Sequence, residues 1–321
     1  MRAAPGAVVV LRALHLGDLL TAVPALRALA RAFPRRRRLL AAPAALAPLA
    51  ALTGAVDAVI DTPGLVPLDP VLAGAALAVN LHGRGPRSTE LLRASRPGCL
   101  IAFEVAGGPA WDDRDHERVR WCRLLEHHGI PADPEDFRLG VPAPAPAGLA
   151  ALAGATIIHP GASSGARCWP AERWAAVAAA EAGAGRRVAI TGTGAEAVLA
   201  ASVARDAGLG PDSVLAGRTS LRELVHLVHG AGRVVCGDTG VAHLASALGR
   251  PSVVLFGPTA PARWGPPPSG PHAVLWAGQT SDPHAGAPAP GLLAIGVNDV
   301  LDALQHLGGP GGVPGPTAAT R

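Results

Sequence analysis

Lysine and tyrosine are missing from this sequence of 321 residues, and cysteine and long apolar runs are scarce. Without lysine the chain cannot form a P-loop of the G-x-x-x-x-G-K type. Its four cysteines lie far apart with no C-x-x-C pair, which argues against a zinc site or a disulfide framework and favours a reducing, cytoplasmic compartment. No apolar run reaches the roughly 18 residues of a membrane span. The first residues also lack the pattern of a signal peptide.

Alanine, glycine, proline and arginine are abundant instead. Hydrophobic residues make up 49% and charged residues 16%, which is enough apolar material for packed cores and too little charge for disorder. The length predicts two domains. Arginine stands where lysine is usual, as in chains from GC-rich genomes, so the net charge of +4 does not indicate a nucleic-acid partner, and none is expected.

Short β-branched runs alternate with alanine- and leucine-rich helical runs, which predicts α/β domains with doubly wound parallel sheets. Strands are expected at Ala7–Leu14, Leu39–Ala42, Ala55–Asp61, Ala76–His82, Cys99–Val105, Thr156–His159, Arg187–Thr191, Ser213–Ala216, Arg233–Cys236, Ser252–Phe256 and Ala273–Trp276. Helices are expected at Leu19–Phe33, Asp115–His128, Ala171–Ala182, Ala195–Ala207, Leu221–His229, Val241–Leu248 and Val297–Leu307. In such sheets ligands bind at the carboxyl ends of the strands.

A proline-rich stretch, V-P-A-P-A-P-A-G from Val141 to Gly148, separates the two halves. Prolines at alternate positions can continue neither a helix nor a ladder, so this stretch predicts a linker. We expect an N-terminal domain over residues 1–142, a linker over 143–152 and a C-terminal domain over 153–307. The last helix either stays with the C-terminal domain or packs back on the N-terminal one. The glycine- and proline-rich tail, 308–321, is predicted to be disordered.

The motif richest in chemistry is V-V-C-G-D-T-G-V-A-H, which ends at His243. A strand is expected to end before Gly237, and a helix to begin near Gly240, so free backbone N–H groups and the helix dipole form a site for a diphosphate. Thr239 either caps this helix or donates to a phosphate oxygen. Asp238 would repel phosphate, so it is assigned to loop orientation or to a sugar hydroxyl. The simpler alternative is a strand–turn–helix with an ordinary cap.

A second motif, H-P-G-A-S-S-G-A-R-C-W-P, also follows a predicted strand. Ser163 and Ser164 supply hydroxyls and Arg167 supplies a cation, before a helix whose first position suits Pro170. Hydroxyls and an arginine fork can stabilise a diphosphate leaving group as its charge develops. The alternative is a long connection that contains an arginine by chance.

The third motif, L-H-L-G-D, follows the first strand and ends at Asp18. A carboxylate there would face an interdomain cleft and could take the proton of an acceptor hydroxyl. The alternative is an N-cap aspartate for the next helix. His15 is the second candidate base.

Together these motifs resemble those of the ADP-heptose lipopolysaccharide heptosyltransferases, glycosyltransferase family nine. The resemblance is carried by the opening G-D-x-x-T-x-x-P, by H-P-G-A-S-S…R-x-W-P, and by G-D-T-G-x-x-H-L-A…G-x-P-x-x-x-L-F-G-P-T. It extends from about residue 8 to residue 307. The positions in the opening motif are Gly17, Asp18, Thr21 and Pro24, and the last motif runs from Gly237 to Thr259.

The resemblance implies a GT-B fold and an inverting glycosyltransferase that needs neither metal nor cofactor. The donor would be a nucleotide-sugar such as ADP-heptose, held by the C-terminal domain, and the acceptor a lipopolysaccharide-like glycan or a natural product. Asp18 matches the general base, with Thr21 and His15 on the acceptor side. The donor- and phosphate-binding positions are Ser163, Ser164, Arg167, Glu196, Asp238, Thr239, Gly240 and His243, with Glu196 on the ribose hydroxyls.

The chain departs from the family pattern mainly on the acceptor side. Arg167 replaces a usual lysine, which keeps the charge but changes its geometry. Leu14 and His15 stand where small residues are usual, and Ala102 replaces a usual glycine, so these departures concern the acceptor rather than the donor class. Two alternatives stay open: a nucleotide-sugar epimerase of the same fold, and a non-catalytic nucleotide-sugar-binding protein. The run Arg35–Arg38 is either a solvated charge run or a peripheral contact with an anionic acceptor or membrane.

Overall fold

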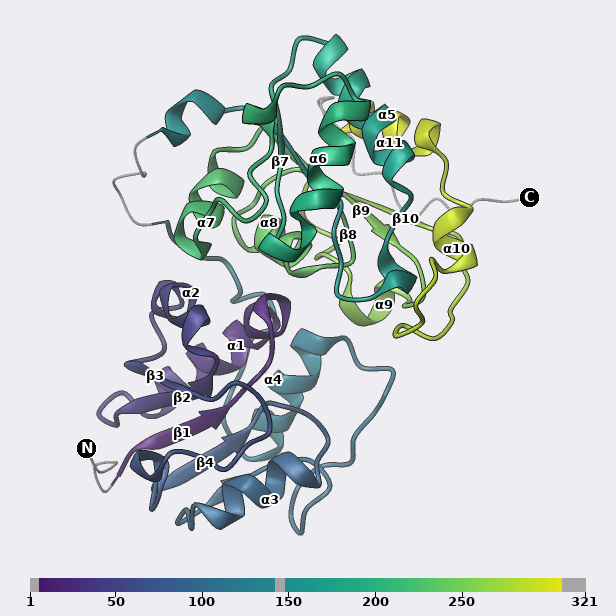
Figure 1. Cartoon of the computed structure of the whole chain (residues 1–321). Helices are drawn as coiled ribbons and strands as arrows, with labels where there is room; N and C mark the ends of the chain where they lie inside the picture. Colours follow the sequence, from purple (N-terminus) through teal and green to yellow (C-terminus); the bar gives the residue numbers. More distant parts are fainter. Residues whose placement is uncertain (1–5, 142–147, 308–321) are drawn as a thin grey trace. The chain divides into compact units, whose positions relative to one another are not determined.

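The computed structural model describes residues 6–141 and 148–307, and the chain divides into two compact units, residues 1–140 and 141–321. Each unit is built on one five-stranded sheet, and the strands pair in parallel (Figure 1). Because parallel strands need crossover helices, both faces of each sheet are covered. The prediction of two α/β units with parallel sheets is confirmed.

The N-terminal sheet has the strand order β3-β2-β1-β4-β5. Its strands are β1 (Val8–Leu11), β2 (Arg38–Ala42), β3 (Ala58–Asp61), β4 (Leu77–Asn80) and β5 (Leu100–Ile101). Its helices are α1 (Leu16–Ala32), α2 (Ala47–Leu52), α3 (Arg87–Ala94) and α4 (Glu117–His127), with 3-10 turns at Ala44–Leu46 and Pro70–Leu72. The order reverses between β1 and β4, and this topological switch point is where such sheets bind ligands.

The central strand β1 is buried along its whole length. Val9 and Leu11 pack in a core cluster with Leu92 of α3, whereas α1 and α4 pack together as a pair. A strand that is covered on both faces has a continuous run of apolar residues, which is why the run V-V-V-L could be predicted as a strand from the sequence.

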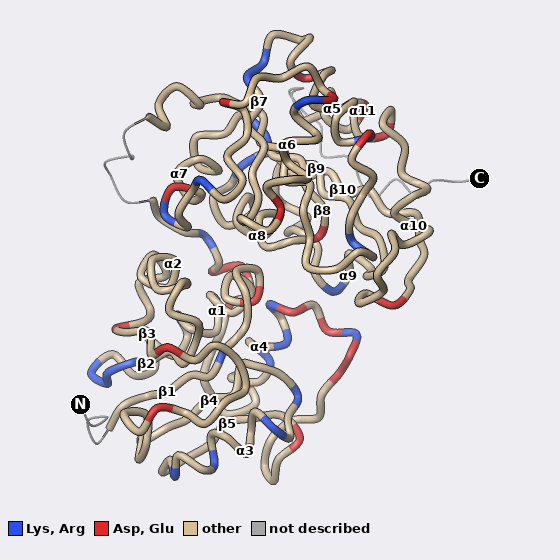
Figure 2. The backbone as a smooth tube through the Cα atoms, in the orientation of Figure 1, with Lys and Arg blue, Asp and Glu red and all other residues tan. Residues whose placement is uncertain are grey.

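The run Arg35–Arg38 extends from the connection after α1 to the first residue of β2 and forms a continuous basic segment (Figure 2). Arg38 is paired with Asp57, Nη2 to Oδ1 at 2.7 Å, and the Arg36 guanidinium lies 5.7 Å from the centre of the Phe33 ring. Two of the four arginines, Arg36 and Arg38, therefore have a partner within the N-terminal unit.

The C-terminal sheet has the order β10-β9-β8-β6-β7. Its strands are β6 (Thr156–His159), β7 (Val188–Ile190), β8 (Arg233–Gly237), β9 (Ser252–Phe256) and β10 (His272–Trp276). Its helices are α5 (Ala171–Gly183), α6 (Ala197–Asp206), α7 (Leu221–Gly230), α8 (Gly240–Ala247), α9 (Pro261–Trp264), α10 (Pro290–Leu293) and α11 (Val297–His306), with 3-10 turns at Leu149–Leu152, Gly165–Arg167, Gly194–Glu196 and Pro211–Ser213. Here the order reverses between β6 and β8.

Helices α5, α6 and α11 cover one face of this sheet, and α7 packs beside α8 (Figure 1). The core between sheet and helices contains Trp169 and Trp174, whose rings pack edge-on with 5.0 Å between the ring centres. Helix α11, which could have packed on either domain, contacts α5, β9 and β10 of its own unit.

Two strand predictions need correction. The expected strand Ser213–Ala216 is a 3-10 turn through Ser213 followed by a single bridge between Val214 and Ile190. Pro211 opens that turn and Gly217, at φ +72°, ends the extended segment, so no ladder grows. The expected strand Cys99–Val105 is only two residues long, because the chain turns at Glu104, which has φ +53°.

Half of the expected linker and all of the expected tail lie outside the described residues. Residues 143–147 of the expected linker and the whole expected tail, 308–321, are not among the described residues, so the predicted disorder of the tail stays a prediction. The last part of the expected linker, Leu149–Leu152, forms a 3-10 turn in the C-terminal unit.

Candidate functional site

Two of the predicted motifs meet at the switch point of the C-terminal sheet. β6 and β8 are neighbours, with His159 opposite Cys236 at their carboxyl ends. The loop that carries Arg167 leaves β6 there, and the G-D-T-G turn leaves β8 beside it. The fold thus brings together two segments about 70 residues apart in sequence, at the place where α/β sheets bind ligands.

Glycines allow the Arg167 loop to lie close against the strand ends. A Cβ on Gly237 would stand 3.4 Å from the carbonyl oxygen of Arg167, and one on Gly165 would collide with the Gly286 backbone. Ala166 donates to the Ala285 carbonyl at 2.9 Å and accepts from the Ala289 N–H at 3.1 Å. The loop is therefore fixed from both sides.

Helix α8 begins immediately after the turn, with Thr239 at the N-cap and Gly240 as its first residue. The Thr239 side chain makes no capping bond, so of the two roles considered for it, capping the helix is not the one adopted. His243 lies one turn inside α8, half-buried, and its ring meets Trp264 of α9 edge-on at 5.9 Å. The first N–H groups of α8 keep the capacity to bind an anion.

Asp238 and Arg167 form the electrostatic centre of this region. The Asp238 side chain is buried, and burial raises its pKa to about 6, against a smaller lowering by the charge of Arg167. Arg167 Nε is itself buried and has no hydrogen-bond partner in the described part of the chain. A guanidinium with an unsatisfied buried N–H suits a site completed by an anionic ligand.

Asp238→Asn is expected to stabilise the protein at pH 8 and not at pH 4. The folded pKa of about 6 exceeds the ordinary value of 3.8, so the native state binds this proton more tightly than the unfolded chain. The contribution of Asp238 to the free energy of unfolding is therefore fully present below about pH 4 and is lost as the pH rises to about 6. The loss is about 3 kcal/mol, and it does not occur in the asparagine variant. Thermal unfolding of both proteins at the two pH values measures it. An equal difference in stability at both pH values would contradict the assignment.

The remaining donor-side residues differ in how they are engaged. Ser163 is exposed, whereas the Ser164 hydroxyl donates to the Pro283 carbonyl at 2.6 Å and so fastens the loop. Glu196 Oε2 accepts from the Thr193 N–H at 2.6 Å, and its carboxylate fills the space where Gly161 lacks a Cβ. Pro170 is the N-cap of α5, one position earlier than predicted.

In the N-terminal unit, Asp18 lies near the carboxyl end of β1. It is the third residue of α1, not its N-cap; the N-cap is His15, whose backbone N–H donates to Asp18 Oδ2 at 3.2 Å. The Asp18 side chain is 22% exposed, so one edge of the carboxylate reaches solvent. His15 itself is exposed.

The Thr21 hydroxyl is engaged by other groups of the N-terminal unit. It is buried, donates to the Asp18 carbonyl at 3.0 Å and accepts from Arg12 Nη2 at 3.1 Å. These contacts fix the first turn of α1, and the assignment of Thr21 to the acceptor side stays a prediction.

Sequence reasoning missed a buried charged pair beneath Asp18. Arg12 is fully buried; its Nη2 lies 3.1 Å from Glu117 Oε1 of α4 and 3.5 Å from Asp18 Oδ1, and its Nε donates to the Asp18 carbonyl at 2.9 Å. Glu117 also accepts from Arg120 and, at 3.1 Å, from Trp121 Nε1. A lone arginine inside the run V-V-V-L-R-A-L was the available signal, since an arginine is fully buried only when it is paired.

Comparison with known proteins agrees with this arrangement. Residues 114–285, more than half of the chain, match the model of glycosyltransferase family 9 (heptosyltransferase). The chain belongs to glycosyltransferase family 9. The resemblance seen in the motifs is therefore confirmed.

Curated relatives of this family 9 chain match over a short segment. Lipooligosaccharide heptosyltransferase 2 of Haemophilus influenzae is 47% identical over 47 residues, 15% of this chain and 14% of the relative. The matched segment thus spans about one seventh of that protein.

Solved structures match nearly the whole length at lower identity. ADP-heptose lipopolysaccharide heptosyltransferase II of E. coli is 20% identical, with a TM-score of 0.76 over 94% of this chain and 98% of that one. E. coli heptosyltransferase WaaC with ADP is also 20% identical, with a TM-score of 0.66 over 94% of this chain and 99% of the other. These likenesses show the fold, and the expected GT-B class is confirmed.

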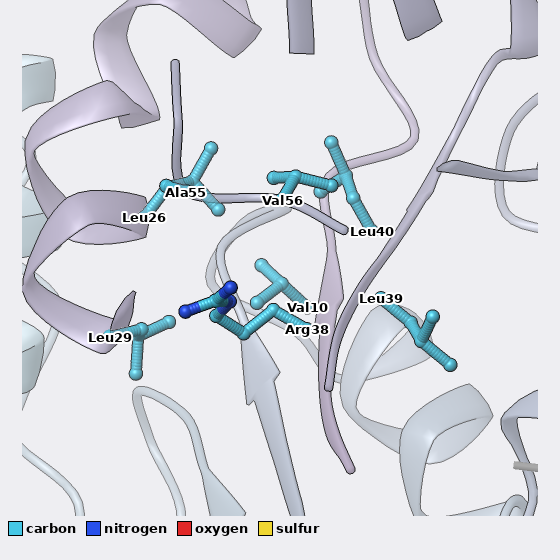
Figure 3. A pocket seen from close by; sticks show the side chains of 8 residues that line it. All are labelled: Val10, Leu26, Leu29, Arg38, Leu39, Leu40, Ala55 and Val56. Atoms are coloured by element: carbon cyan, nitrogen blue, oxygen red, sulfur yellow. The ribbon is translucent and has the colours of Figure 1, made fainter. Parts of the chain in front are cut away.

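A pocket elsewhere in the family 9 chain holds none of the predicted site residues. It lies in the N-terminal unit between α1 and β2, and its lining is apolar apart from Arg38 (Figure 3). It is lined by Val10, Leu26, Leu29, Arg38, Leu39, Leu40, Ala55 and Val56.

None of the helices within the described ranges has both the length and the apolar character of a membrane span.

Proposed function

We propose that this chain transfers a heptose-like sugar from an ADP-sugar to a hydroxyl of a glycan acceptor, with inversion and without a metal ion or cofactor. The observation that carries the proposal is the meeting of the Arg167 loop with the start of α8 at the β6/β8 switch point. Family membership supports the reaction class, and the presence of ADP in the E. coli WaaC structure supports adenine as the donor base.

The donor diphosphate is assigned to the C-terminal unit. Arg167 supplies a full positive charge, and the N–H groups at the start of α8 supply a partial one. Ser163, the exposed hydroxyl of the loop, is the third donor. Asp238, with its pKa near 6, opposes an anion less than an ordinary aspartate does, and it is assigned to a hydroxyl of the donor sugar.

The acceptor is assigned to the N-terminal unit, with Asp18 as general base. The acceptor oxygen gives its proton to the Asp18 carboxylate and forms a bond to the anomeric carbon of the donor. The bond from that carbon to the diphosphate oxygen breaks, and its electron pair leaves with ADP. Because this is a single displacement, the configuration at the anomeric carbon inverts. The charge of the leaving ADP is stabilised by Arg167 and α8, which is why the proposal needs no metal.

The acceptor class follows the family. Relatives carry the names of lipooligosaccharide and lipopolysaccharide heptosyltransferases, so a sugar of a lipopolysaccharide-like glycan, or of a glycosylated natural product, is proposed. The basic run Arg35–Arg38 offers exposed guanidinium groups at Arg35 and Arg36, and we propose these as a peripheral contact with an anionic acceptor or membrane.

Arg167→Ala is expected to weaken ADP binding by about 10- to 100-fold, because a hydrogen bond to a charged group contributes about 1.5–3 kcal/mol. Isothermal titration with ADP in EDTA measures the effect. Arg205→Ala is the matched control, since Arg205 is an exposed arginine of the same unit that pairs with Asp206. Unchanged ADP affinity in Arg167→Ala would remove Arg167 from the donor site.

A further inference from the structure

A histidine at the same edge of the N-terminal sheet as Asp18 plays no part in the mechanism so far. β4 is the neighbour of β1 across the switch point of the N-terminal sheet, with Leu11 opposite Asn80. His82 follows β4 by two residues, and the segment that leads to Asp18, the third residue of α1, follows β1. The two segments leave the same edge of the sheet at the position where ligands bind in this topology.

The backbone around His82 is held from both sides. The His82 N–H donates to Asn80 Oδ1 at 3.0 Å, and the Asn80 amide, which is buried, donates in turn to Ser88 at 2.9 Å and Thr89 at 3.0 Å. On the other side, the carbonyl of Leu81 accepts from Arg12, the arginine that also contacts Asp18. His82 and Asp18 are therefore positioned by one common residue.

The ring of His82 is half-buried and its two nitrogens differ. Nδ1 is buried and has no hydrogen-bond partner among the described residues, so the accessible edge of the ring is the one with Nε2. The pKa of His82 is lowered to about 4, chiefly by burial and then by the charge of Arg12, against a raising effect of Asp18. The imidazole is therefore neutral near pH 7. The buried Nδ1 lies in the field of the positive charge of Arg12, which favours an unprotonated Nδ1 over an N–H group without an acceptor. The neutral ring therefore carries its proton on Nε2.

We propose that His82 is an acceptor-binding residue, whose Nε2–H donates a hydrogen bond to the hydroxyl that Asp18 deprotonates. This inference rests on the proposed function. The acceptor oxygen then receives one hydrogen bond from His82 and directs its own proton to Asp18, so the pair fixes both the position and the orientation of the nucleophile. The ligand recognised is the hydroxyl of an uncharged sugar ring, because the neutral imidazole offers one donor and no charge.

The first test examines the tautomer of His82 in the free protein. In ¹⁵N-histidine NMR spectra, assigned with His82→Gln, the ring is expected to stay neutral from pH 6 to pH 8 with its proton on Nε2. A proton on Nδ1, or titration near the ordinary pKa of 6.5, overturns the proposal, because Nε2 could then not serve as the neutral donor.

The second test compares transfer by variants, using ADP-heptose with a panel of methyl hexosides as acceptor probes. His82→Ala is expected to lower kcat/KM for the probe about tenfold, mainly through KM, and His82→Gln to recover part of it. The ADP-induced thermal shift is expected to be unchanged in both. His127→Ala, which removes an exposed histidine at the end of α4, is the control and is expected to match wild type.

A kcat/KM in His82→Ala within twofold of wild type overturns the proposal. A wild-type protein that binds ADP but transfers to no probe counts against the proposed glycan acceptor rather than against His82, and the NMR result then decides on His82 alone.

Discussion

Asp18→Asn is expected to lower the rate of glycosyl transfer by about 10²- to 10⁴-fold, the usual contribution of a general base. Asparagine keeps the size of the side chain, and its amide oxygen can still accept from the His15 N–H at the start of α1. What it loses is the ability to take a proton. Because the proposed donor site lies in the other unit, the ADP-induced thermal shift is expected to be unchanged.

Asp61→Asn is the matched control for that experiment. Asp61 is also a carboxylate at the carboxyl end of a strand of the N-terminal sheet, where it accepts from the Ala44 N–H at 2.8 Å. Transfer is measured as release of ADP from ADP-heptose in the presence of the methyl hexoside panel. Turnover of Asp18→Asn at the wild-type rate would leave Asp18 a structural residue of α1, and the base would have to be sought elsewhere.

Glu117→Ala is expected to destabilise the N-terminal unit by about 3–5 kcal/mol, the cost of removing one partner of a buried ion pair. Glu117 is 5% exposed and its carboxylate lies between Arg12 and Arg120, both of which are buried. Without it, two guanidinium groups remain in the interior without that counter-ion. Since Arg12 also contacts Asp18, the variant is expected to lose transfer activity as well.

Urea unfolding gives the loss of free energy, and amide hydrogen exchange in α1 and α4 localises it. Asp136→Ala is the control: Asp136 pairs with Arg27 and Arg31 of α1 but its side chain is 28% exposed, so its loss is expected to cost no more than about 1 kcal/mol. Equal destabilisation by the two substitutions would show that the Arg12–Glu117 pair is not a special feature of the unit.

Much of the fold could be read from local pattern. The boundaries of β6 and β9 agree with prediction because each is a short, mainly apolar run followed directly by proline or glycine, and α8 was located by the turn that precedes it. Strand order is different: nothing in the sequence states that β6 lies between β7 and β8, although both motif loops depend on it. The strand predicted over Ser213–Ala216 was wrong, because the segment has the pattern of a strand but Pro211 and Gly217 limit its pairing to one bridge.

The residues of the candidate site could also be predicted from local sequence pattern only in part. Asp18, Arg167 and Asp238 follow strand ends in sequence, so their position at the sheet edge could be predicted. The partner of Arg12 could not, because Glu117 is 105 residues away and reaches it only through the packing of α4 on α1. The engagement of Ser164 with Pro283, 119 residues on, was equally invisible to local pattern.

The most direct test of the central claim, that the C-terminal unit binds an ADP-sugar without metal, is a thermal-shift panel with ADP, GDP, UDP, CDP and TDP in EDTA. A ligand at 100 times its dissociation constant stabilises the folded protein by about 2.7 kcal/mol, which raises the unfolding temperature by several degrees. We predict a shift that is selective for ADP, persists in EDTA and is lost in Arg167→Ala. A shift with none of the five nucleotides would contradict the account.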